Sequence, residues 1–115
     1  MDLVAASGGA RAILWYPGLP AGGFSNAVSI STGANAPSSV VAGDIDHDGD
    51  CDFARAQPST GEVKRAFNNN KIGTTWGQAT LLSVPGILSL TAGNANADAD
   101  MDFITVAGSG AVTWH

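Results

Sequence analysis

Short runs of apolar and β-branched residues alternate with polar turns along the whole chain. In the central region these runs cover residues 38–42, 52–56, 62–67 and 79–84. Turn-forming residues separate them, as in Pro58-Ser-Thr-Gly61. No stretch has the 3.6-residue apolar spacing and the caps that are typical of an amphipathic helix. The pattern therefore predicts an all-β protein with no helix.

The same pattern repeats after about 50 residues. At this offset several pairs of residues are identical, among them Ser39 and Ser89, Ala42 and Ala92, and Gly43 and Gly93. Four short strands in each repeat are typical of a four-stranded antiparallel β-propeller blade. We therefore expect ten strands, divided three, four and three, in about 2.3–2.5 blades. The predicted division is an incomplete first blade over residues 1–37, a second blade over 38–87 and an incomplete third blade over 88–115.

Large apolar residues recur at matching positions of the repeat. The matching sets are Leu3, Phe53 and Phe103; Ile13, Val63 and Val112; Trp15 and Trp114, with Arg65 between them; and Phe24 and Trp76. Such positions are expected to pack between neighbouring blades. A closed propeller needs about six or seven blades. The chain is therefore expected either to be part of a longer propeller or to associate with other copies of itself, because its terminal blades would otherwise lack a cover.

Acidic residues form a ladder in the centre of the chain. It has the pattern D-x-D-x-D-G-D-x-D and consists of Asp44, Asp46, Asp48, Asp50 and Asp52. Carboxylates at such close spacing repel one another unless a hard cation lies among them. Alternate oxygen ligands, with a glycine at position six to turn the chain, are what calcium requires. The ladder therefore predicts a Ca²⁺ site, and the alternative is a solvated acidic turn without metal.

A second ladder follows about 50 residues later. Its candidate ligands are Asn94, Asn96, Asp98, Asp100 and Asp102. Two asparagines replace aspartates, and Ala99 replaces the glycine, which would strain the loop if that position needs a positive φ. Two interpretations stay open, a degenerate calcium site or a turn closed by Asx side-chain bonds without metal. Met1-Asp2-Leu3 is the tail of a third copy that lacks its first half.

An EF-hand is the competing metal motif. Its loop ends on a bidentate glutamate at position twelve, where this chain has Arg55. An EF-hand is also flanked by helices, whereas the segments on either side of this ladder have the composition of strands. The ladder is therefore predicted to lie in a turn between two strands.

Composition narrows the function. All ten acidic residues except Glu62 lie in the ladders, so the net charge of −5 belongs to the predicted metal sites. The chain has no basic stripe for nucleic acid, no apolar run long enough to cross a membrane and no leader typical of a signal peptide. Its single cysteine, Cys51, matches Met1 and Met101 in the repeat and is expected in the core. His47 is expected to point outward.

The segment from Ser39 to Phe53 resembles the FG-GAP/VCBS repeat, which is found in integrin-α-type β-propellers and in many secreted bacterial proteins. Residues 3–7, 13–16 and 23–25 resemble the later part of the same repeat. The resemblance implies that four aspartates bind calcium through their side chains and a fifth through its carbonyl. The four are Asp44, Asp46, Asp48 and Asp52, and the fifth is Asp50. In this family calcium usually holds a loop between two strands.

Two functions follow as hypotheses. The first is a non-enzymatic, calcium-binding module of an extracellular or cell-surface protein, with an adhesion, lectin-like or scaffold role and a glycan or protein ligand. The second is an accessory propeller domain cut from a larger secreted enzyme. No nucleophile elbow, zinc-protease motif or phosphate loop occurs in the sequence, so we expect no catalysis. Because Met1 lies inside a repeat, we expect the chain to be cut from a longer protein.

Overall fold

The computed structural model describes residues 2–69 and 75–115. Over these residues the chain folds into strands only, which confirms the prediction of an all-β protein without helix. The ten strands are β1 (Leu3–Ser7), β2 (Ala12–Tyr16), β3 (Val28–Ser31), β4 (Ser39–Gly43), β5 (Asp52–Gln57), β6 (Glu62–Asn68), β7 (Trp76–Ser83), β8 (Ile87–Gly93), β9 (Asp102–Ala107) and β10 (Val112–Trp114). The described residues contain no helix that is long and apolar enough to cross a membrane.

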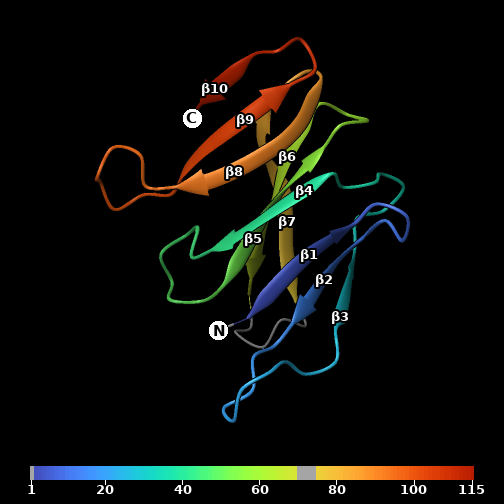
Figure 1. The fold of residues 1–115 in the computed structure, drawn as a ribbon, viewed down its shortest axis with the longest axis vertical. Coiled ribbons are helices and arrows are strands. Elements are labelled where there is room, and N and C mark those ends of the chain that lie inside the picture. Colours follow the sequence, from blue (N-terminus) through green and yellow to red (C-terminus); the bar gives the residue numbers. More distant parts are fainter. Residues whose placement is uncertain (1, 70–74) are drawn as a thin grey trace.

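The strands form three antiparallel sheets, each a simple meander. The orders are β1-β2-β3, β4-β5-β6-β7 and β8-β9-β10, so the sheets hold three, four and three strands as predicted. Figure 1 shows them stacked along the molecule, with the four-stranded sheet between the other two. We call them the first, middle and third sheets. They have the form of propeller-like blades, and over the described residues they do not close into a ring.

Each face of the middle sheet packs against a neighbouring sheet. Against the first sheet lies a core of Ile13, Trp15, Ile30, Phe53 and Ala66. Against the third sheet lies a core of Ala54, Ala56, Val63, Ile87, Leu90 and Phe103. Successive residues of a strand point to opposite faces, and β5 supplies both cores from adjacent residues. All six residues of β5 are therefore buried.

The strand register reproduces the repeat that the sequence shows. Val4 pairs with Trp15 in the first sheet, Ala54 with Arg65 in the middle sheet, and Ile104 with Trp114 in the third. Positions of equal repeat phase thus occupy equal places in their sheets. The Trp15 ring meets Trp76 edge-on, with 6.2 Å between centroids, and Trp76 lies 5.0 Å from Phe53. These repeated aromatics pack between two sheets, as expected.

Gly43, the residue just before the first ladder, is in close contact with the end of the second loop. A Cβ atom on Gly43, the last residue of β4, would overlap the Cε atom of Met101. The matching Gly93 has no neighbour near its missing Cβ. Cys51 is half-buried rather than fully buried, because it lies where the loop enters β5. Burial still raises the pKa of its thiol, helped by the charges of Asp2 and Asp52.

Candidate metal centre

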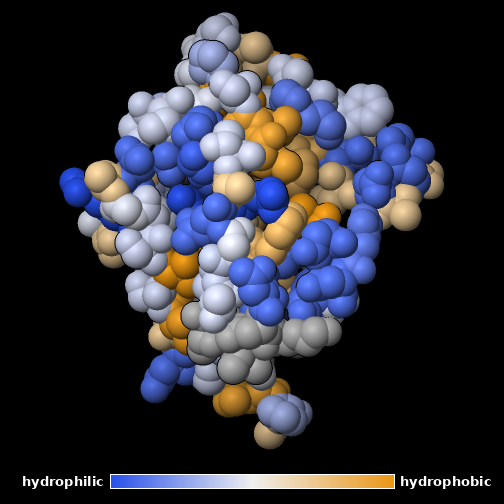
Figure 2. Space-filling model, turned by 180° about the vertical axis from the view of Figure 1, so that it is seen from behind, coloured by the Kyte–Doolittle hydropathy of each residue, from blue (hydrophilic) through white to orange (hydrophobic). Residues whose placement is uncertain are grey.

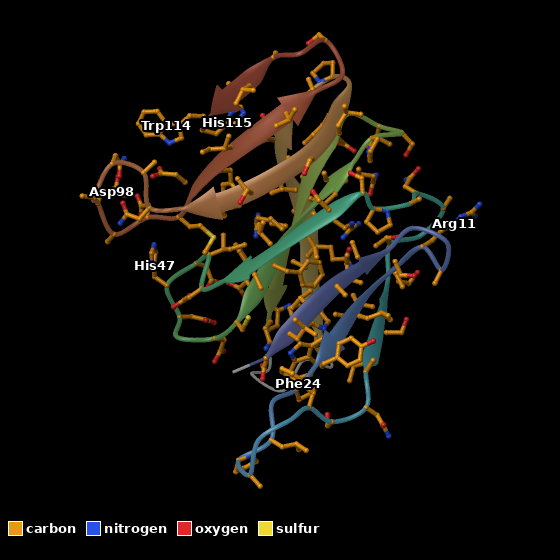
Figure 3. All side chains as sticks on the ribbon, viewed as in Figure 1. Arg11, Phe24, His47, Asp98, Trp114 and His115 are labelled. Atoms are coloured by element: carbon orange, nitrogen blue, oxygen red, sulfur yellow. The ribbon has the colours of Figure 1, made fainter. Side chains whose placement is uncertain are left out.

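Both ladders lie in turns between two antiparallel strands, as the sequence predicts. The first loop joins β4 to β5 and the second joins β8 to β9. The two loops lie side by side at one edge of the molecule (Figure 3), and His47 Nε2 lies 3.1 Å from Asp100 Oδ1. A cleft of about 580 Å³ lies between them, with Val41 and Met101 among its lining residues.

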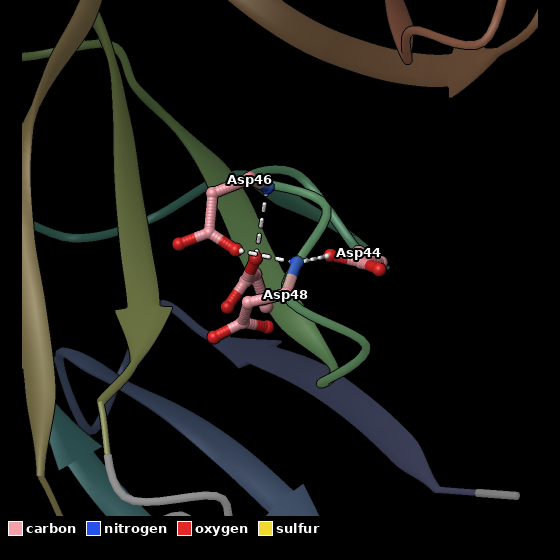
Figure 4. Close-up of side chains that lie close together, drawn as sticks. Asp44, Asp46 and Asp48 are labelled. Atoms are coloured by element: carbon pink, nitrogen blue, oxygen red, sulfur yellow. Dashed lines mark hydrogen bonds between the residues drawn. The ribbon is translucent and has the colours of Figure 1, made fainter.

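The first loop winds its backbone around its own carboxylates. Asp44 accepts hydrogen bonds from the backbone N–H of Asp48 (3.1 Å) and of Gly49 (3.0 Å), and Asp48 Oδ1 accepts one from Asp50 (2.9 Å). Figure 4 shows the bonds from Asp48 N to the carboxylates of Asp44 and Asp46. Gly49 has a φ of 91°, a conformation that glycine adopts without strain. The glycine at position six therefore does what the sequence predicts and turns the chain.

Asp52, the last residue of the ladder, is 1% exposed and anchors the loop to the sheet. Its Oδ2 atom accepts hydrogen bonds from Ile45 N (2.9 Å) and Asp46 N (3.4 Å). Its Oδ1 atom accepts one from Asn68 N (2.9 Å) at the end of β6. The side chain therefore joins the loop to β6, the strand that follows and pairs with β5, a structural role that the ladder pattern alone did not indicate.

The matching residues of the other repeats have related roles. Asp2 accepts hydrogen bonds from Trp15 Nε1 (3.1 Å) and Gly18 N (2.8 Å) in the first sheet. Asp102 accepts one from Ala95 N (2.6 Å) in the second loop. The last aspartate of each ladder therefore accepts hydrogen bonds from loop or strand donors of its own sheet, with or without a full set of acidic neighbours.

Four carboxylates of the first loop converge on one point. Asp44, Asp46, Asp48 and Asp52 each offer an oxygen, and these four atoms all lie within 4.8 Å of one another. The pKa of the Asp46 carboxyl is raised above its usual range. Loss of hydration is the largest cause, and repulsion from the charges of Asp52 and Asp48 adds to it. The donor set is all oxygen and strongly anionic, which fits a hard cation such as Ca²⁺. Asp50 is outside this group of side chains.

In the second loop, asparagine amide groups stand where the first loop has carboxylates, and they donate hydrogen bonds. Asn94 Nδ2 donates to the carbonyl oxygen of Asp98, and Asn96 Nδ2 donates to Asp98 Oδ2 (2.6 Å). In return, Asp98 N donates to Asn96 Oδ1 (3.0 Å). Across the described residues of this loop, no three acidic, His or Cys side chains converge as they do in the first loop. The loop is closed by bonds among its own Asx side chains.

The backbone of the second loop also departs from the first. Ala97 has a φ of 64°, matching His47 at the same position of the first loop, also 64°. Ala99, at position six, is outside the positive-φ region. The strain that we considered for an alanine at this position is absent, because the loop takes a different path there.

His47 is exposed, as the sequence analysis expected, but it also has a partner. It meets Asp100 of the other loop, 53 residues further along the chain. The pattern of neither ladder indicates this contact, because it depends on how two sheets stack.

Antiparallel meanders stacked face to face, with an acidic turn between the first two strands of the middle sheet, define a class of repeat proteins with propeller-like blades. The comparison with known families agrees. Residues 1–55 match the family described as an FG-GAP-like repeat, which confirms the resemblance seen in the sequence. The match takes in the first sheet, β4 and the whole first loop. No curated protein and no solved structure matched the chain.

Proposed function

We propose that the first loop binds one Ca²⁺ ion and that the chain is a non-enzymatic repeat module of an extracellular adhesion, lectin-like or scaffold protein. The observation that carries this proposal is the convergence of four carboxylate oxygens within 4.8 Å of one another. An FG-GAP-like repeat over residues 1–55 supports it, because such repeats are often calcium-binding and are typical of extracellular proteins.

In this proposal Asp44, Asp46, Asp48 and Asp52 hold the ion, and Asp50 contributes its carbonyl oxygen. The ion supplies positive charge where the carboxylates repel one another. Of the four side chains, only Asp52 is also bonded to β6. Calcium would therefore fix the exposed turn to the buried sheet and act as a structural element rather than a catalytic one. One bound ion would change the net charge from −5 to −3.

In this proposal the module acts through its loops, and its partner would be a glycan or a protein that contacts the loop-bearing edge. The carboxylates that could act as acids or bases serve as metal ligands in this proposal. The localisation that goes with it is the outside of the cell or the cell surface.

Calcium-dependent stability tests the proposal. A ligand that binds only the folded state at a hundredfold excess over Kd stabilises it by roughly 2.7 kcal/mol. Thermal denaturation with calcium should therefore occur several degrees higher than with chelator. Identical melting curves, together with no calcium by elemental analysis, would contradict the proposal.

Two matched substitutions locate the ion. Asp46→Ala removes one anionic ligand from the first loop at an exposed position, and titration calorimetry should show that binding is lost or strongly weakened. Asn96→Ala, at the same position of the second loop, is the control and should leave the affinity nearly unchanged. Equal losses in the two variants would place calcium in both loops.

A further inference from the structure

The cleft between the two ladder loops has an apolar floor. Its volume of about 580 Å³ lies within the roughly 300–1,000 Å³ that is usual for ligand pockets. Val41, Ala92 and Met101 line it, and all three are half-buried residues at the margin of the core between the middle and third sheets. Figure 2, in which the loops lie at the right, shows hydrophilic residues along both loops and apolar atoms between them. The cleft is therefore the place where this core reaches the loop-bearing edge.

The rim of the cleft is polar and comes from both loops. Asp44 and His47 lie on the side of the first loop, and Asn94 and Asp100 lie on the side of the second. His47 Nε2 meets Asp100 Oδ1 at 3.1 Å. Asp100 Oδ2 has no hydrogen-bond partner among the described residues, and the Asp100 side chain is 76% exposed. Asp100 therefore offers an acceptor to a group that enters the cleft.

The charge around the cleft is strongly negative and stays negative with calcium bound. The two ladders contain eight of the ten acidic residues, and neither contains a lysine or an arginine. In the proposed function one Ca²⁺ ion offsets two of these eight negative charges, so six are left. A concave surface with charge of one sign attracts ligands of the opposite sign. The cleft therefore favours a positively charged group.

The arrangement of the rim does not suit a second metal ion. The four oxygen atoms that lie within 4.8 Å of one another all come from the first ladder, and Asp100 does not belong to that group. A metal ion needs several ligand atoms in direct contact with it at once, whereas these carboxylates lie on two sides of a cleft. An organic cation with an apolar stem and a charged head matches an apolar floor with an acidic rim.

The lining also distinguishes between a glycan and a protein as the partner. Sugar rings usually pack against the rings of Trp, Tyr or Phe, and none of the described residues that line the cleft is of these types. The stems of lysine and arginine pack along apolar surface, while their charged heads contact water or a carboxylate. The flexible side chain of Met101 can adapt to such a stem. The cleft thus fits a protein better than a glycan.

From these observations we propose that the cleft binds a basic side chain, lysine or arginine, of a partner protein. The stem lies on Val41, Ala92 and Met101, and the charged head meets Asp100 at the rim. The contact rests on the proposed function and adds to it the chemistry of the partner at the loop-bearing edge. Asp100 is outside the four side chains that hold calcium in that proposal, so calcium binding and partner binding can be measured separately.

Nuclear magnetic resonance of the whole chain with a short capped peptide tests this contact. The probe is a peptide with one arginine between alanines. Its control is the same peptide with citrulline, which has nearly the same shape but no charge. In calcium buffer the arginine peptide should shift the amide signals of residues 41–43, 92–94 and 99–101, and it should bind roughly fivefold or more tightly than the citrulline peptide.

Three variants locate the contact. Asp100→Asn removes one charge from the rim and should weaken binding of the arginine peptide roughly two- to fivefold. Asp98→Asn removes the same charge from the same loop but outside the lining of the cleft, so it is the matched control and should leave binding nearly unchanged. Ala92→Leu places a larger side chain in the floor without a change of charge and should abolish the amide shifts. Thermal denaturation confirms that each variant is folded.

Three outcomes would overturn the proposal. One is equal affinity for the arginine and citrulline peptides. Another is an equal loss of affinity in Asp98→Asn and Asp100→Asn, which would indicate general attraction to an acidic surface. The third is specific binding of a glycan in the cleft without any response to the arginine peptide.

Calorimetric titration with calcium on the same samples separates this proposal from the proposed function. A chain that binds calcium but not the arginine peptide contradicts only the basic side chain in the cleft. A chain that binds the peptide in the cleft but binds no calcium supports the cleft and contradicts only the calcium site.

Discussion

The two acidic loops occupy the same place in neighbouring sheets but balance their charge in different ways. The first loop gathers four carboxylates around one point, where their charges repel one another. The second loop has two asparagines, whose amide groups donate to the carbonyl and carboxylate of Asp98. A side-chain amide is both donor and acceptor. One type of substitution, aspartate to asparagine, therefore separates a loop of converging carboxylates from a loop whose side chains hydrogen-bond to one another.

The comparison extends to the residues that frame each loop. Asp52 accepts three backbone hydrogen bonds and Asp102 accepts one from Ala95. Position six is a glycine with positive φ in the first loop and an alanine outside that region in the second. We therefore expect substitutions in the first loop to lower the stability of the protein more than substitutions at matched positions of the second loop.

The largest difference is expected at the last aspartate of each ladder. Asp52→Ala leaves three backbone donors without their acceptor at a site that is 1% exposed, and an unsatisfied buried donor costs about 1–3 kcal/mol. We expect it to lower the free energy of unfolding by about 2–4 kcal/mol, and Asp102→Ala by about 1 kcal/mol. Urea unfolding in the presence of chelator measures both without any contribution from metal. Equal losses of stability in the two variants would contradict the inference that Asp52 anchors its loop more strongly than Asp102 does.

The next effect is the conversion of the second loop into the first type. Asn94→Asp combined with Asn96→Asp removes the amide donors to Asp98 and adds two negative charges. In chelator, the free energy of unfolding should fall by about 1–2 kcal/mol. In calcium, the loss should be recovered, and titration calorimetry should show one more ion bound per chain.

The control for this conversion is Asn94→Ala combined with Asn96→Ala. It removes the same donors without adding charge, so it should lose stability but gain no calcium binding. If the two aspartates bring no new binding, the path of the backbone at Ala99, and not the charge of the loop, decides whether calcium binds.

Backbone conformation should give a smaller effect of opposite sign in the two loops. Gly49→Ala places a side chain at a φ of 91° and should destabilise the protein by about 1 kcal/mol or more. Ala97→Gly relieves a residue at a φ of 64° and should stabilise it by up to about 1 kcal/mol. Thermal denaturation of the two variants in the same buffer tests both signs. A destabilising Ala97→Gly would show that this residue has packing that outweighs its strain.

The smallest difference is expected just before the ladders. Gly43→Ala would overlap the Cε atom of Met101, a flexible side chain that can rotate away, so the loss should be about 1 kcal/mol. Gly93→Ala meets no neighbour and should be neutral or stabilising by about 0.5 kcal/mol. Equilibrium unfolding of the pair measures this. A neutral Gly43→Ala would mean that Met101 gives way without loss of packing.

The sequence was sufficient to predict the strands, their division among the sheets and the place of the acidic turn. Side chains alternate between the two faces of a strand. Phe53 pairs with Ala42 as Phe103 pairs with Ala92, so the strand pairing of one repeat predicts that of the next. The contact of His47 with Asp100 and the bond from Asn68 to Asp52 could not be predicted. The first contact depends on how two sheets stack, and the second on where the neighbouring strand β6 ends, and the ladder pattern encodes neither.

The path of the second loop was beyond prediction for a related reason. A missing glycine at position six indicates strain only if the backbone keeps its course, and here the loop changes course at Ala99. Local sequence can name the residue that a given turn requires, but it does not decide which turn the chain adopts when that residue is replaced.

Because the middle sheet is covered on both faces, it should unfold later than the strands at the ends of the stack. Every residue of β5 is buried, whereas every residue of β10 is exposed. In stacked repeats each unit is held only by its neighbours, so opening begins at the ends. Amide hydrogens of β10 should exchange with solvent by local fraying. Those of β5 should exchange only when the whole stack comes apart.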